Sequence, residues 1–159
     1  MNLWERELAP CESVLARLSA PGRLRLAVTA LEWSYFTMRE PIEDVEARGW
    51  IDQARAAAHA AVEEVANRIT LAPAQQDAFR ELDESVEEYG VAQFMTGFMA
   101  AAEVETLSEE TLANILYICY VFAVQREEPE PESIEEQEAN DRCLEVIAYH
   151  KELIRQAPA

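Results

Sequence analysis

The sequence predicts an all-α protein, folded as a single-domain irregular bundle of about six to eight helices. Three observations favour this fold class. Helix-forming Ala, Leu and Glu are abundant, while only four glycines occur in 159 residues. Apolar residues recur at helical spacing through most of the chain. The length suits one domain that can bury its own core, covering residues 1–159.

The first part of the chain predicts two short helical pieces and one long helix. The short pieces are expected over 3–8 and 12–18, with Pro10 between them. The long helix is expected over 24–38, because its apolar residues are spaced at i, i+4 and i+7. Pro41 ends that helix, since the residue before a proline avoids the helical region.

The middle of the chain contains a break followed by two further helices. Residues 41–49 are expected to form a turn or a short helical piece that Gly49 closes. A helix over 51–69 carries an alanine-rich face, which lets a neighbouring helix approach closely. An amphipathic surface helix is then expected over 73–89.

The last part predicts three helices and a linker. Helices are expected over 91–104 and 106–125, and a buried strand is the alternative for 115–122. Residues 126–133 contain two prolines and several glutamates, which predicts an extended acidic linker. The final helix is expected from Ser133 to Gln156, because Ser133 and Glu136 have the spacing of a capping box.

The charge is strongly negative and restricts the classes of partner. The chain holds 31 acids and 13 bases, a net charge of −18. Such a chain repels nucleic acid and anionic membranes and attracts basic surfaces. We therefore expect neither a nucleic-acid nor a membrane partner. The longest apolar run, Ile115–Val124, is too short for a bilayer, and the start does not resemble a signal peptide, so we expect a cytoplasmic protein.

Sequence motifs of catalysis are missing. There is no Gly-rich phosphate loop, Cys-x-x-Cys, His-Glu-x-x-His or nucleophile elbow, so we expect no catalytic residue, metal or cofactor. His59 lies one turn before Glu63, which favours a local surface pair. His150 lies on an apolar helix face, where a core role is favoured over a functional one.

Two acidic segments are the candidate partner-binding residues. Helical spacing puts Asp77, Glu81, Glu84 and Glu88 within about 60° of one another, opposite an apolar stripe. The full candidate set adds Glu87 and three residues of the linker, and is Asp77, Glu81, Glu84, Glu87, Glu88, Glu127, Glu128 and Glu130. A plain solvated surface is the simplest alternative interpretation of these acids.

These observations favour a non-catalytic acidic binding protein that binds and neutralises a basic protein partner. Bacterial immunity proteins and antitoxins act in this way as a class, and the likeness lies in size, charge and the missing catalytic motifs. One alternative is a metal-dependent all-helical phosphohydrolase with Glu81, Glu84 and Glu88 as ligands. A second alternative is a structural or adaptor bundle that forms a homodimer.

Overall fold

A computed structural model describes residues 1–158, and every regular element within them is helical. The predicted all-α, single-domain bundle is confirmed. The elements are α1 (Leu3–Leu8), a 3₁₀ turn (Ala9–Cys11), α2 (Glu12–Arg17), α3 (Ala20–Thr37), α4 (Val45–Glu63), α5 (Pro73–Ser85), α6 (Val91–Ala102), α7 (Glu109–Gln125), α8 (Ile134–Glu138) and α9 (Asp141–Gln156).

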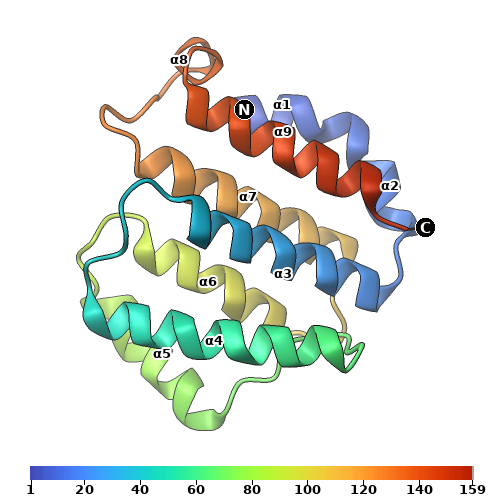
Figure 1. The fold of residues 1–159 in the computed structure, drawn as a ribbon, viewed down its shortest axis with the longest axis vertical. Helices are drawn as coiled ribbons and strands as arrows, with labels where there is room; N and C mark the ends of the chain where they lie inside the picture. Colours follow the sequence, from blue (N-terminus) through green and yellow to red (C-terminus); the bar gives the residue numbers. More distant parts are fainter. Residues whose placement is uncertain (159) are drawn as a thin grey trace.

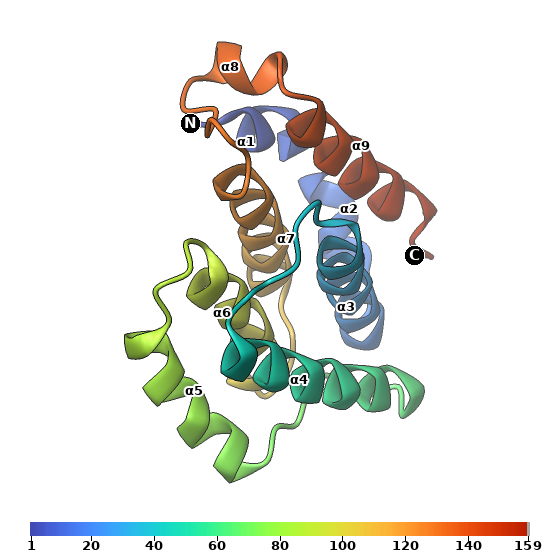
Figure 2. The same ribbon diagram turned by 60° about the vertical axis from the view of Figure 1, so that its left-hand side comes forward.

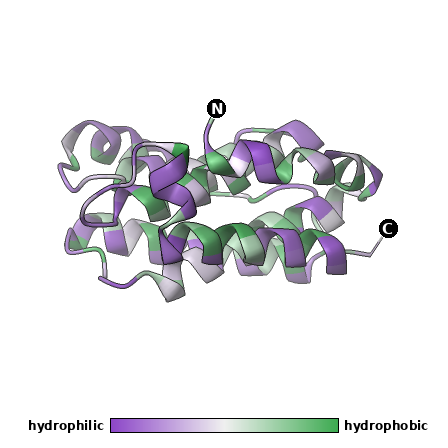
Figure 3. Cartoon of the chain, turned by 90° about the horizontal axis from the view of Figure 1, so that it is seen from above, coloured by the Kyte–Doolittle hydropathy of each residue, from purple (hydrophilic) through white to green (hydrophobic). Residues whose placement is uncertain are grey.

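Helix α7 lies at the centre of the bundle and packs against α3, α6 and α9. On one side of this centre lie α4 and α5, and on the opposite side lie α1, α8 and α9 (Figures 1 and 2). Leu116 of α7 is buried in the same core as Leu31 of α3 and Ile147 of α9. The outer helices therefore present one face to this core and the other to solvent, and polar and apolar residues alternate along them (Figure 3).

The helical interpretation of residues 106–125 is correct, and the strand alternative is wrong. Ser108 caps the N-terminus of α7, because its hydroxyl accepts a hydrogen bond from the Thr111 amide at 3.1 Å. Gly97 of α6 allows close packing, since a Cβ atom there would lie 2.9 Å from Leu31 Cδ2. Small size at this position lets α6 approach α3.

Helix α4 begins earlier than the sequence predicts. A turn or short helical piece that Gly49 closes is expected over 41–49 from the sequence; residues 45–49 are helical, but they belong to the long helix α4, which Asp44 caps by accepting the Ala47 amide at 2.9 Å. Gly49 therefore lies inside α4 rather than closing a turn. The helix also ends at Glu63, before the predicted end at 69, because the chain then turns sharply through Val65 at a φ of 56°.

The C-terminal part contains two helices instead of the single one expected over 133–156. Ser133 caps α8 by accepting the Glu136 amide at 3.0 Å, as its sequence pattern predicts. Asn140 then caps α9 by accepting the Cys143 amide at 2.9 Å. The caps at Ser133 and Asn140, seven positions apart, thus divide this stretch into two helices.

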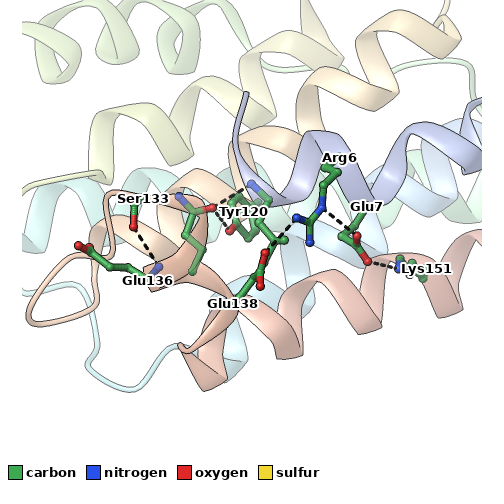
Figure 4. Close-up of polar contacts among 9 residues, drawn as sticks. Arg6, Glu7, Tyr120, Ser133, Glu136, Glu138 and Lys151 are labelled. Atoms are coloured by element: carbon green, nitrogen blue, oxygen red, sulfur yellow. Dashed lines mark hydrogen bonds and ion pairs between the residues drawn. The ribbon is translucent and has the colours of Figure 1, made fainter.

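Polar contacts attach α1 to α8 and α9. The buried Gln137 side chain accepts hydrogen bonds from the Leu3 amide at 3.1 Å and from the Tyr120 hydroxyl at 2.6 Å. Nearby, Arg6 pairs with Glu138 at 2.9 Å, and Glu7 pairs with Lys151 at 3.0 Å (Figure 4). The N-terminal helix is therefore held against the C-terminal part of the chain.

None of the helices within residues 1–158 is both long enough and apolar enough to cross a bilayer.

Candidate partner-binding surface

Helix α5 carries three exposed acids on its outer face. Pro73 occupies the first turn, and the inner face buries Gln75 and Leu82. Asp77, Glu81 and Glu84 are exposed. Asp77 has one weak ion pair, with the equally exposed Arg80 at 3.3 Å. Glu81 and Glu84 pair with no basic side chain of the described chain. This part of the predicted acidic row is therefore present.

The predicted row does not extend to Glu88, because α5 ends at Ser85. Val86 adopts an extended conformation, with ψ of 117°, and leaves the helix. Gly90 then precedes the first residue of α6 and has a φ of 84°, in the left-handed region that favours glycine. Glu87 is exposed in this connection, away from the regular spacing of α5.

Glu88 turns inward and joins three segments of the chain. One carboxylate oxygen accepts the backbone amides of Glu43 at 2.9 Å and Asp44 at 3.0 Å. The other oxygen pairs with Arg126 at 3.1 Å, and the Glu88 side chain is only 22% exposed. Its inclusion in an outward-facing row is therefore corrected: this carboxylate satisfies groups of the same chain.

The acidic linker is only partly solvated. Glu127 accepts hydrogen bonds from Arg39 at 3.0 Å and Asn140 at 3.2 Å, and its side chain is 10% exposed. Glu128 is exposed, and Glu130 is half-buried with its carboxylate 3.4 Å from the Tyr89 hydroxyl. The predicted second acidic surface is thus reduced, because its first glutamate is used inside the fold.

The candidate residues line two separate hollows. Glu88 and Glu128 line a polar hollow of about 310 Å³, together with Arg126. Glu81 lines a different groove of about 530 Å³ between α4 and α5, whose wall also contains Glu46, Gly49, Trp50, Ala78 and Leu82. The structure therefore brings Glu81 and Glu46 to one groove and leaves the linker acids at another place.

The groove between α4 and α5 has a fixed floor. The Trp50 indole N–H donates to the Gln75 carbonyl oxygen at 2.8 Å, and the Gln75 side-chain amide donates to the Trp50 carbonyl oxygen at 2.8 Å. Trp50 is only 3% exposed. Because these two bonds are reciprocal and buried, they hold the two helices at a set separation.

Sequence reasoning missed this groove because it placed the start of α4 after Gly49. The Trp residue at position 50 was one available signal, because a large aromatic residue next to the alanine-rich helix needs a packing partner. The partner belongs to α5, 25 residues further along the chain. Local spacing carries no information about that pairing.

A polar cluster between α3 and α4 is also absent from the sequence interpretation. Arg55 donates to both carboxylate oxygens of Glu32, at 2.8 and 2.6 Å, and lies over the Phe36 ring at 4.6 Å. The hydrogen bond from Arg55 lowers the pKa of Glu32. His59 lies 3.2 Å from Glu32, so its expected pairing with Glu63 is wrong. These groups satisfy one another across the helix interface.

The ligand set of the phosphohydrolase alternative is not assembled. Its three glutamates would be Glu81, Glu84 and Glu88, but the last is engaged with Arg126 and two backbone amides. No three His, Cys, Asp or Glu side chains among residues 1–158 are grouped so that they could hold a metal ion.

His150 lies in the core rather than at a surface site. Its Nδ1 accepts a hydrogen bond from the Trp4 indole N–H at 2.9 Å, and the residue is 0% exposed. Burial, with a smaller contribution from the positive charge of Arg142, lowers the pKa of His150 to about 3. A neutral imidazole that packs on Trp4 agrees with the core role favoured from the sequence.

Similarity to known proteins gives no guide to the role of these surfaces. No protein-family model, curated protein or solved structure matches this chain. The function is therefore argued from the arrangement of the charges and grooves.

Proposed function

We propose that this protein is a non-catalytic acidic binding protein of the cytoplasm that binds and neutralises a basic protein partner. The observation that carries this proposal is the outer face of α5. There Asp77, Glu81 and Glu84 are exposed together beside an open groove. Glu87 is exposed just beyond the end of α5, Glu128 and Glu130 lie at a separate place, and Glu88 and Glu127 mainly support the fold.

The face of α5 is electrostatically unfavourable in the isolated protein. Asp77 and Glu81 are four residues apart and Glu81 and Glu84 are three apart, so each pair repels by roughly a few tenths of a kcal/mol. Arg80 offsets only one of these charges, because it pairs with Asp77. Lysine or arginine side chains of a partner would remove the repulsion.

The net charge of −18 acts over a longer range. A strongly negative surface accelerates the approach of a basic protein, and complementary charges select it over neutral or acidic proteins. The size of the protein and its surplus of acids fit an inhibitor that covers a basic surface.

The test is to measure association with the partner captured from the native host and then purified. We expect Glu81→Gln combined with Glu84→Gln to slow association at low salt and to flatten its salt dependence, because peripheral charges act mainly on the association rate. Folding stability should stay unchanged or rise slightly, since the repulsion is relieved.

The matched control removes the same charge elsewhere. Glu63→Gln combined with Glu64→Gln alters two exposed acids at the far end of α4. Glu63 lies about 25 Å along α4 from the groove residue Glu46 at the usual helical rise, beyond the screening length of about 8 Å at physiological salt, so association should change little. Equal rates and equal salt slopes for the protein and both variants would reject the acidic face of α5 as the partner surface.

A further inference from the structure

We propose that the groove between α4 and α5 is the docking site for a basic amphipathic helix of the partner. An apolar side chain of that helix would enter the groove over Gly49, while its lysines or arginines would meet Glu46 and Glu81. This inference rests on the proposed function and specifies the chemistry of the partner.

Gly49 provides the first argument. A glycine in a helix interior costs about 0.5–1 kcal/mol relative to alanine. Gly97 has a reason inside the fold, since a Cβ there would lie 2.9 Å from Leu31. At Gly49 a Cβ would meet nothing within 4 Å. The absence of a side chain at this position therefore serves no internal packing, but it leaves the groove open to another backbone.

The shape of the groove provides the second argument. Its volume of about 530 Å³ lies within the range of ordinary ligand pockets, roughly 300–1,000 Å³. Trp50, Ala78 and Leu82 form the apolar part of its lining, and Gln53, Gln75 and Ser85 join the two acids in the polar part. Two helices form its walls, and their contact is fixed by the paired Trp50 and Gln75 hydrogen bonds. A preformed groove between helices with both apolar and polar lining suits the apolar edge and the polar flank of an amphipathic helix.

The charge around the groove selects the occupant. Glu46 and Glu81 line it, no basic residue does, and Glu84 follows one turn further along α5. A helix with lysines or arginines beside its apolar edge complements this arrangement. A second copy of the chain does not, because two proteins of charge −18 repel.

The test uses two synthetic helical peptides that carry the same number of lysines. One peptide has leucines along one face, and the other has glutamines in their place. Binding is measured by calorimetry with the unaltered protein and with three variants: Gly49→Trp, Gly49→Ala, and Glu81→Gln combined with Glu84→Gln. Thermal melting confirms that each variant is folded, and the Gly49→Ala variant keeps the groove open.

We expect the unaltered protein to bind the leucine peptide about tenfold or more tightly than the glutamine peptide, as burial of one apolar side chain provides. Gly49→Trp fills the groove and should abolish this preference without changing binding of the glutamine peptide. Gly49→Ala should retain the preference. The double glutamine variant should weaken binding of both peptides. The Trp50 indole N–H resonance should shift only with the leucine peptide.

Two outcomes would overturn the docking site: equal affinity for the two peptides, or a leucine preference that survives Gly49→Trp. If the double glutamine variant still binds both peptides more weakly than the unaltered protein does, the acidic surface is supported and only the docking groove is rejected. If the leucine preference disappears in Gly49→Trp while the double glutamine variant binds normally, the groove stands and the acidic face of α5 fails.

Discussion

The imidazole of His150 illustrates how one buried side chain couples folding to pH. In the folded protein the ring is enclosed beside Trp4, and its pKa falls to about 3 because burial disfavours the charged form. In the unfolded chain the pKa is about 6.5. Between these values the unfolded chain binds a proton that the folded protein does not, so stability falls as the pH is lowered through this window.

A pH dependence of unfolding should therefore depend on His150. Lowering the pH from about 7 to about 5 should cost about 2 kcal/mol through this residue alone. In His150→Asn, denaturant unfolding should show a correspondingly smaller loss over the same pH change, whatever the stability of the variant at neutral pH. A folded-state imidazole resonance that is assigned to His150 and titrates near pH 6.5 would contradict this prediction.

At the scale of elements, the end of α5 determines which acids face solvent. The helix stops at Ser85, and the connection to α6 turns Glu88 towards the N-terminus of α4. There its carboxylate accepts two backbone amides that precede the first turn, which also suits the positive end of the α4 dipole. Glu84, the second-to-last residue of α5, remains exposed. Two similar glutamates thus have different roles.

Alanine substitution should separate these two roles. We expect Glu88→Ala to lower the free energy of unfolding by about 1–3 kcal/mol, because it leaves Arg126 and two backbone amides without their partner. Glu84→Ala should change stability by less than about 0.5 kcal/mol, as exposed sites do. Denaturant titration of both variants provides the comparison, and similar losses for the two would refute the inward position of Glu88.

For the whole molecule, the surplus of negative charge opposes the packing of the core. The 13 bases can neutralise at most 13 of the 31 negative charges, so a large surplus of carboxylate charge remains. The ion pairs that are exposed on both sides, among them Arg6–Glu138, Arg80–Asp77 and Arg155–Glu152, contribute only about 0–1 kcal/mol each. Repulsion among the acids should therefore outweigh the attraction within these pairs.

Salt should accordingly stabilise this protein. Sodium chloride screens both repulsion and attraction between exposed charges, and repulsion predominates at a net charge of −18. We expect the melting temperature to rise between low and moderate sodium chloride concentrations. Replacing salt with an uncharged solute of equal osmolarity serves as the control. A melting temperature that falls with salt would mean that the ion pairs predominate.

The sequence by itself determined the helical class and several local features. The apolar residues of α7 and the cap at Ser133 were predicted correctly. These features depend on interactions within about one turn of helix, or on apolar residues spaced at the helical period. Such interactions can be recognised without knowing where the helix lies in the fold.

Only the tertiary structure decided which acids and which glycine are exposed at the groove between α4 and α5. Glu88 meets amides 44 and 45 residues away, and Trp50 meets Gln75 across 25 residues. Spacing predicted Glu88 to face outward and Gly49 to close a turn or short helical piece, and both interpretations failed. The physical reasons differ: the local cap at Asp44 starts α4 before Gly49, whereas the inward position of Glu88 depends on long-range contacts that outweigh helical spacing. The groove between α4 and α5 exists only because those contacts place the two helices side by side.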